Sequence, residues 1–180
     1  MATKVFRNLG LAGAAAMVAA GGSLLASASG DPSPAYDREA TTLEAREIAQ
    51  SASKTFDRAD LNNDGYVSQD EYQILAIVTA ELSRLNGFVA IDGASGVQKV
   101  GFGAPSNVDM PAMTKRAIIS AAQRQYALLS GEDQKLTRNE FIDGDLETFI
   151  ASDRDRDGVL TGDELLSFAA ARARVGVRSS

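Results

Sequence analysis

The chain has 180 residues and carries 18 basic against 24 acidic side chains, a formal net charge of −6. This acidic balance argues against a nucleic-acid partner, because phosphate binding needs a basic face. The sequence contains no histidine and no cysteine, which excludes imidazole acid–base catalysis, thiol nucleophiles, disulfides and ordinary zinc sites. We therefore expect a protein that is not an enzyme, and any bound metal should be a hard cation held by oxygen.

Residues 1–28 have the composition of a secretory signal peptide. Lys4 and Arg7 form a short positive start, residues 9–20 are apolar, and a pattern of small residues ends at Ala28, where we expect cleavage. An uncleaved anchor is the alternative, because weakly apolar residues continue far enough to approach the span that a bilayer requires. With cleavage, we expect a bacterial protein of the periplasm or the medium, without stable membrane insertion.

The remainder is predicted to be a linker and one all-α domain. Residues 29–37 contain two prolines among polar neighbours and form the linker, and the domain covers residues 38–180. Apolar residues recur there at steps of three and four, which indicates helices. The predicted helices cover residues 38–59, 68–85, 109–129 and 137–150, with a last helix ending near residue 171. Their apolar faces are Ile48, Ala52 and Phe56 in the first helix and Tyr72, Leu75, Val78 and Leu82 in the second.

Residues 86–108 lose this periodicity and are rich in glycine. A long loop without secondary structure is unusual inside a compact domain, so we interpret the segment as a linker or a functional flap. Its glycines fit neither the phosphate-loop nor the dinucleotide-binding spacing.

Two stretches of twelve residues, 60–71 and 153–164, meet every position of the EF-hand pattern. Here the chain resembles the EF-hand family, over these two loops and their flanking helices. The resemblance implies helix–loop–helix pairs, joined by a short strand contact between loops, and one calcium ion in each of two sites. In the family, the eighth loop position makes the strand contact; it is Val67 in one loop and Leu160 in the other.

The spacing within each loop suits calcium, which takes six to eight oxygen ligands at about 2.3–2.6 Å. Alternating residues of a tight loop turn their side chains inward, and glycine at the sixth position permits the sharp turn. The seventh residue offers its carbonyl, the ninth acts through a water, and the twelfth contributes both carboxylate oxygens. The predicted ligands are Asp60, Asn62, Asp64, the Tyr66 carbonyl, Ser68 and Glu71 in one loop, and Asp153, Asp155, Asp157, the Val159 carbonyl, Thr161 and Glu164 in the other.

A metal-free interpretation of these loops stays open. The ninth and twelfth residues of each loop have the spacing of a helix capping box, and Asp-rich turns with glycine also occur without metal. In favour of the hands, Phe56 and Phe149 each lie four residues before a loop, where the incoming helix needs a core anchor.

Residues 129–140 keep only the second half of the pattern. Leu129, Gly131 and Gln134 stand where Asp, Asp and Gly belong, while the ninth and twelfth residues retain the capping pair. We interpret this stretch as a degenerate hand without an ion, and residues 82–93 as a still weaker relic. Because only twelve residues separate the degenerate hand from the loop at 153–164, we expect these two to pair. The loop at 60–71 would then pair with the 82–93 relic or dock across the protein.

The two intact loops cannot be ranked from the sequence. The loop at 153–164 places four carboxylates at ligand positions against three at 60–71, but Arg154 and Arg156 flank its ligands and offset part of that gain.

Several roles remain open for such a protein. It is a calcium sensor, a calcium buffer or a calcium-stabilised interaction module with an unidentified protein partner; the alternative is a structural protein merely braced by calcium. A lanthanide-binding relative is a further alternative. Such relatives carry proline at the second loop position and an acid at the ninth, where this chain has Leu61 and Arg154, then Ser68 and Thr161.

Overall fold

A computed structural model describes residues 38–93 and 96–173, and the predicted signal peptide and linker lie outside these ranges. The described residues are mostly helical, so the all-α prediction is right in outline, although three two-stranded sheets accompany the helices. No helix within the described ranges is long and apolar enough to cross a membrane.

The predicted helices are present, with one shortened at its start. The helices are α2 (Ala45–Ala59), α3 (Gln69–Asn86), α4 (Ala112–Leu129), α5 (Arg138–Ser152) and α6 (Gly162–Ala173). The strands are β1 (Thr42–Glu44), β2 (Tyr66–Val67), β3 (Phe88–Gly93), β4 (Gly96–Gly101), β5 (Leu136–Thr137) and β6 (Val159–Thr161). The helix expected from residue 38 begins only at Ala45, because β1 precedes it.

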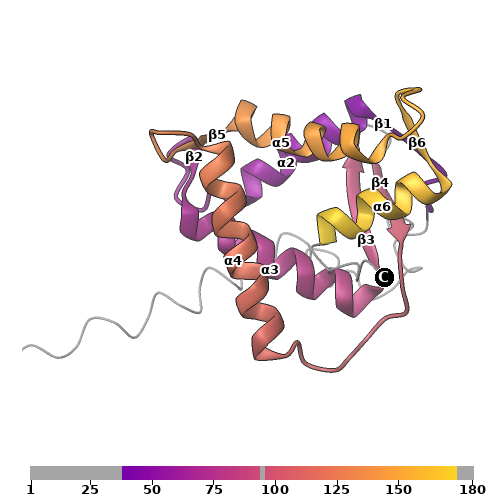
Figure 1. The fold of residues 1–180 in the computed structure, drawn as a ribbon, viewed down its shortest axis with the longest axis horizontal. Helices are drawn as coiled ribbons and strands as arrows, with labels where there is room; N and C mark the ends of the chain where they lie inside the picture. Colours follow the sequence, from indigo (N-terminus) through magenta and orange to yellow (C-terminus); the bar gives the residue numbers. More distant parts are fainter. Residues whose placement is uncertain (1–37, 94–95, 174–180) are drawn as a thin grey trace, which may run out of the picture. The chain divides into compact units, whose positions relative to one another are not determined.

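The same series of elements occurs twice along the chain: strand, helix, loop, strand, helix. It runs from β1 to α3 and again from β5 to α6, and α2 packs against α5 between the two series (Figure 1). β1 pairs antiparallel with β6, with Leu43 opposite Leu160, and β2 pairs antiparallel with β5, with Val67 opposite Leu136. Because each strand pair joins opposite ends of the two helices, α2 and α5 run antiparallel.

This topology corrects the predicted pairing of the loops. The loops at 129–140 and 153–164 flank the 15 residues of α5, which span about 22 Å at 1.5 Å per residue. They cannot touch each other across a helix of that length. The loop at 60–71 pairs with the degenerate loop at 129–140 instead, and the loop at 153–164 pairs with β1.

The glycine-rich segment is also corrected, because residues 88–101 form an antiparallel hairpin of β3 and β4. Val89 and Ile91 on β3 and Val100 on β4 are buried, and the exposed Ala90 alternates with them. Such alternation is typical of a strand with one buried face. The prediction of a fourth hand at 82–93 is therefore wrong: its first residues end α3 and the rest form β3.

Helix α3 ends where it does because of Gly87. This residue has φ +73°, a left-handed conformation that glycine adopts without strain. A Cβ there would lie 2.4 Å from the Gly103 carbonyl oxygen. A side chain at this position would therefore displace the segment that follows the hairpin.

The buried apolar residues form two separate clusters, one at the β2–β5 strand pair and one at the β1–β6 strand pair. The first core contains Ala52, Phe56, Ala59, Val67, Tyr72, Ala76, Ala80, Met110, Ile118, Ala122, Tyr126, Leu136 and Phe141. The second core contains Leu43, Ile48, Val89, Ile91, Val100, Phe149, Leu160, Leu165, Phe168, Ala169 and Ala173. Each core therefore holds one of the two predicted anchor phenylalanines and one of the strand pairs β1–β6 and β2–β5, and the second core also contains the buried face of the β3–β4 hairpin.

The predicted apolar face of α2 is confirmed and that of α3 is displaced. Ile48, Ala52 and Phe56 are all at most 1% exposed. On α3, Leu82 is 50% exposed, and the buried line consists of Tyr72, Ala76, Ala80 and Ser83. The small alanines face inward because α4 packs closely along that side.

Ion pairs fix the hairpin to α2. The Asp92 carboxylate accepts hydrogen bonds from Lys54 Nζ at 2.7 Å and from Arg58 Nη2 at 2.6 Å, and its backbone N–H donates to Ser51 Oγ at 3.2 Å. Burial alone would raise the pKa of Asp92, but the two cations outweigh it and lower the pKa. The charged form of Asp92 therefore stabilises the folded state.

We expect Asp92→Asn to lower the free energy of unfolding by about 1 kcal/mol at pH 7, because both cations are half exposed and the pair is partly screened. A carboxyl group with a lowered folded pKa stabilises above its unfolded pKa of about 4 and loses that effect as the pH falls through the folded value. In denaturant titrations the deficit should shrink as the pH falls below about 4. Asp143→Asn, at an exposed position on α5, is the control; equal stability of both variants at pH 7 would contradict the prediction.

Candidate metal centre

The loop at 60–71 connects α2 to α3 and folds around its own carboxylates. Asp60 caps the end of α2 and is 8% exposed. Its two oxygens accept hydrogen bonds from the backbone N–H groups of Asp64 at 3.1 Å and Gly65 at 3.0 Å. Asp64 Oδ1 in turn accepts from the N–H of Tyr66 at 3.0 Å. Gly65 has φ +85°, which explains why glycine stands at the sixth position.

Glu71 closes this loop from the first turn of α3. Its Oε2 accepts hydrogen bonds from the Ser68 N–H at 2.8 Å and the Ser68 hydroxyl at 2.7 Å. The bond from the Ser68 N–H, together with the Glu71 N–H donating to Ser68 Oγ at 3.4 Å, forms the capping box of α3. Its Oε1 accepts from the Leu61 N–H at 2.9 Å. One side chain thus joins the beginning and the end of the loop.

The loop at 153–164 repeats this arrangement between α5 and α6. Asp153 caps α5, and its Oδ2 accepts from the Gly158 N–H at 3.1 Å. Glu164 Oε1 accepts from the Arg154 N–H at 2.8 Å and Oε2 from the Thr161 N–H at 3.2 Å. The correspondence of these contacts with those of the first loop shows that the two loops share one backbone conformation.

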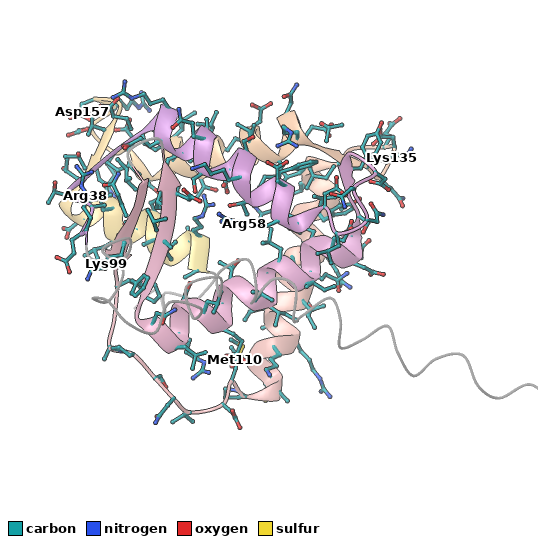
Figure 2. All side chains as sticks on the ribbon, turned by 180° about the vertical axis from the view of Figure 1, so that it is seen from behind. Arg38, Arg58, Lys99, Met110, Lys135 and Asp157 are labelled. Atoms are coloured by element: carbon teal, nitrogen blue, oxygen red, sulfur yellow. The ribbon has the colours of Figure 1, made fainter. Side chains whose placement is uncertain are left out.

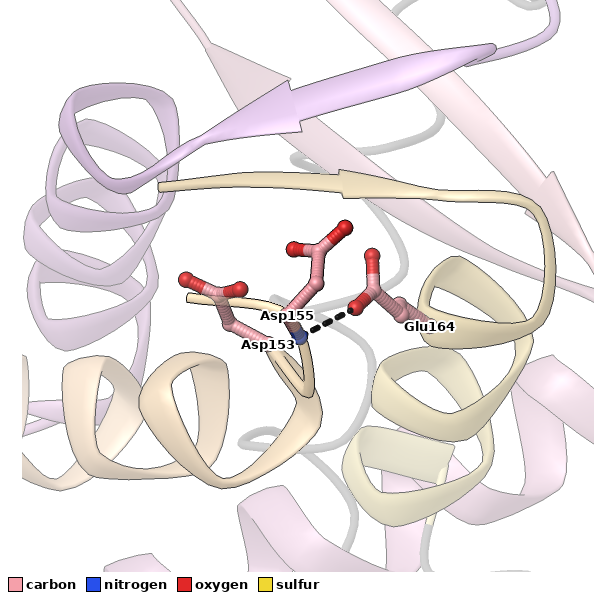
Figure 3. A group of neighbouring side chains, drawn as sticks. All are labelled: Asp153, Asp155 and Glu164. Carbon is pink, nitrogen blue, oxygen red and sulfur yellow. Dashed lines mark hydrogen bonds between the residues drawn. The ribbon is translucent and has the colours of Figure 1, made fainter. Parts of the chain in front are cut away.

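Three predicted ligands converge in this second loop. Asp153, Asp155 and Glu164 each place a carboxylate oxygen within 4.8 Å of the others, and Figure 3 shows the three side chains around one point. Asp153 Oδ1 is buried and has no hydrogen-bond partner. A buried acceptor without a donor is costly, and a cation bound among these three carboxylates would satisfy it. The donor set therefore fits a hard divalent cation.

The other acidic ligands are placed less closely. Asp157 lies outside the converging group, and its Oδ1 accepts from the Val159 N–H at 2.8 Å. Within the described residues, the acids of the 60–71 loop form no group as close as the one at 153–164. There Asp60 uses both oxygens for backbone N–H groups, and Asn62 Nδ2 donates to Asp64 at 3.1 Å.

Glu164 is held in its charged form. The N–H groups of Arg154 and Thr161 donate to its carboxylate, and this lowers the pKa of Glu164 below its ordinary value. The Arg154 guanidinium donates to Ser167 Oγ on α6 at 3.2 Å, so this cation is turned toward α6. The carboxylate at the twelfth position is therefore ionised and available to a metal.

The loop at 129–140 keeps the fold of a hand without its ligands. Leu129, at the first position, packs against the first core. Gln134 takes the left-handed conformation of the sixth position with φ +53°, and Asp133 Oδ1 accepts from the Lys135 N–H at 3.0 Å. Glu140 caps α5 through the Thr137 N–H at 2.8 Å. An apolar side chain at the first position leaves no ligand there, which agrees with the interpretation of a degenerate hand.

The described residues 38–47 have the end of a second degenerate hand, whose twelve-residue pattern would begin at residue 36, and this feature escaped the sequence analysis. Leu43 pairs with Leu160, and Glu47 Oε2 accepts from the Glu44 N–H at 3.2 Å, as the twelfth residue does in the other three loops. The sequence indicates this hand by the spacing from Leu43 to Glu47, which equals the spacing from Leu136 to Glu140 in the loop at 129–140. This stretch also precedes the 60–71 loop by the same interval at which 129–140 precedes 153–164. Residues 36 and 37 lie outside the described ranges.

We expect Glu140→Ala to lower the free energy of unfolding by about 1 kcal/mol, because the Thr137 N–H loses its capping acceptor. The same change should leave the number of bound calcium ions at two, since this loop has no ligand at its first position. Chemical denaturation and calorimetric titration measure the two effects. Loss of one ion in the variant would show that the loop at 129–140 is a working site.

The geometry also ranks the two intact loops. We expect the loop at 153–164 to bind calcium about tenfold more tightly than the loop at 60–71, because it has one more carboxylate and holds three of them together. Glu71→Gln removes a ligand of the loop at 60–71, so calorimetric titration of this variant measures the loop at 153–164. Titration of Glu164→Gln measures the loop at 60–71 in the same way. A lower dissociation constant for the 60–71 loop would refute this ranking.

Comparison with known proteins agrees with the geometry of the loops. The chain matches the family described as EF hand at residues 53–76 and at residues 146–169. Each match contains one intact loop with parts of its two helices. No curated protein and no solved structure matches the chain. EF hands imply calcium binding. These two segments of the chain are therefore similar to the EF-hand family.

Proposed function

We propose that the chain binds two calcium ions, one in each intact loop, through the ligands predicted from the sequence. The observation that carries this proposal is the convergence of Asp153, Asp155 and Glu164 around the unpartnered Asp153 Oδ1. The loop at 60–71 supports it by repeating the same backbone hydrogen bonds. Calcium supplies positive charge among these oxygens when bound.

The side chains of each loop have separate tasks in holding the ion. The aspartates at the first position come from the end of the entering helix, and the glutamates at the twelfth come from the first turn of the exiting helix. A cation held by both groups would connect the two helices. The backbone N–H groups that already orient Glu71 and Glu164 reduce the ordering cost of binding.

A calcium-stabilised module is the role that the packing supports best. The anchors Phe56 and Phe149 are buried, and Met110 is 7% exposed within the first core. Sensors of the calmodulin type bind targets through methionine-rich apolar grooves, and here only Met113 is exposed among the described methionines. Sensor and buffer are the competing roles, and a scaffold braced by calcium for a protein partner is the structural alternative.

The inventory of side chains supports a binding role over catalysis. Without histidine or cysteine, an enzyme would depend on carboxylate or hydroxyl chemistry. Within the described residues, the one close group of acids belongs to a loop that matches the EF hand.

We place the protein in the bacterial periplasm or the medium, on the composition of residues 1–28. Calcium is abundant outside the cytoplasm, so sites with dissociation constants on the order of 10⁻⁴ to 10⁻³ M would be filled. N-terminal sequencing of the exported protein would test this; an intact Met1 would refute cleavage.

Lanthanides would bind the same carboxylates, but the ninth loop positions give no support for selection. Ser68 Oγ donates its proton to Glu71 rather than offering an additional charge, and Thr161 is likewise uncharged. Calcium therefore remains the proposed ion.

Calcium should raise the melting temperature of the protein, because it binds the folded loops and not the unfolded chain. At a free concentration 100 times the dissociation constant, each site contributes about 2.7 kcal/mol. Scanning calorimetry with and without calcium measures the rise, and the double variant with Glu71→Gln and Glu164→Gln should abolish it.

An unchanged melting temperature of the wild-type protein on addition of calcium would contradict the proposal. A calcium titration in the presence of a dye that binds apolar surface distinguishes a sensor from a calcium-stabilised module. A sensor increases the dye signal when calcium binds, and the calcium-stabilised module proposed here leaves it unchanged or lowers it.

A further inference from the structure

We infer that the two calcium sites are independent, so that each ion stabilises only the core next to its own loop. The inference rests on the proposed function, because it requires both loops to bind. It concerns what the fold does with the two ions, and four features of the structure support it.

The first feature is the partner of each intact loop. The strand of the 60–71 loop pairs with β5 of the degenerate loop at 129–140, and the strand of the 153–164 loop pairs with β1. Neither strand pair joins the two intact loops. The two intact loops therefore share no strand contact through which binding in one could act on the backbone of the other.

The second feature is that the degenerate loops cannot transmit binding through an ion of their own. Leu129 occupies the first position of one loop and packs in the first core. In the other, the Ala40 N–H and the Arg38 carbonyl oxygen are hydrogen-bonded to Lys99 of β4, and Glu47 Oε1 accepts from Gln98 Nε2 at 3.1 Å. The hairpin thus already engages Glu47, the residue at the twelfth position, which a working loop would leave to a metal.

The third feature is the division of the apolar interior. Phe56, before the first intact loop, and Val67, within it, lie in the first core, whereas Phe149 and Leu160 have the same places at the other loop and lie in the second core. Tightening one loop compresses one of these clusters. In Figure 2, Asp157 of the 153–164 loop and Lys135, beside the other intact loop, lie at opposite ends of the domain.

The fourth feature is the rigidity of the two helices that connect the cores. α2 contains neither glycine nor proline, and the single glycine of α5, Gly144, packs directly against Leu129. Arg138 of α5 bonds Asp57 of α2 at 2.5 Å, and Arg172 of α6 bonds Asp145 of α5 at 2.5 Å, so one ion pair joins the two helices and a second joins α5 to α6. A coupled response needs an element with two arrangements, and this helix pair offers no hinge for one.

Direct electrostatic coupling between the ions is also weak. Each intact loop begins at the end of a 15-residue helix, and the helices are antiparallel, which separates the loops by about 20 Å. The Debye length at physiological salt is about 8 Å, so the repulsion between two ions is largely screened.

Calorimetric titration of the full chain with calcium, in the wild type and in Glu71→Gln and Glu164→Gln, tests the inference. In each single variant we expect the remaining site to keep its wild-type dissociation constant within about twofold. In the wild type we expect a Hill coefficient no higher than 1. Asp64→Ala and Asp157→Ala, at exposed ligand positions, provide a second pair of variants should either glutamine variant fold poorly.

Amide hydrogen exchange reports which core each ion stabilises, which a binding titration does not show. Calcium added to Glu71→Gln should slow amide exchange at the second core and leave the first core unchanged, and Glu164→Gln should show the reverse. A change of more than about fivefold in the remaining dissociation constant, or protection of both cores by one ion, would overturn independence. A wild-type protein that binds no calcium would refute the proposed function instead.

Discussion

The antiparallel packing of α2 against α5 determines where every loop of the domain lies. Each helix begins at one strand pair and ends at the other, so each also ends beside a strand from the opposite half of the chain. This single arrangement creates two cores, because the loops and strands at each end enclose their own cluster of apolar side chains. It also places one intact loop and one degenerate loop at each end.

The glutamate at the twelfth loop position both caps a helix and, in the two intact loops, is a predicted metal ligand. In all four loops it accepts the N–H of the ninth residue and so caps the following helix. In the two intact loops its other oxygen also reaches the second residue of the loop. The capping contact persists at Glu47 and Glu140, where the ligands are missing. This explains why the degenerate loops still fold as half-hands: their strands and helix starts need no ion.

The sequence predicted the features that depend on local chemistry. Helix positions, the capping pairs, the inward Phe56 and Phe149 and the loss of ligands at Leu129 follow from neighbouring residues. The predicted pairing of the loops at 129–140 and 153–164 is wrong. The twelve residues between them are few, but they belong to helix α5, which keeps the two loops apart. The hairpin was missed because its glycines outweighed the alternation of Val89, Ile91 and Val100. Which carboxylates converge depends on loop closure in three dimensions, and the spacing alone did not distinguish the two loops.

The equal length of α2 and α5, 15 residues each, has a consequence for how this chain can vary in evolution. Inserting one residue in either helix would advance its end by about 1.5 Å and rotate it by about 100°. Such a shift would bring Leu43 or Val67 out of register with its partner strand. A matching insertion in the other helix would be needed to restore both contacts. Homologous chains should therefore change the lengths of these two helices together, while insertions accumulate in the segment between the hairpin and α4, where no strand register has to be kept.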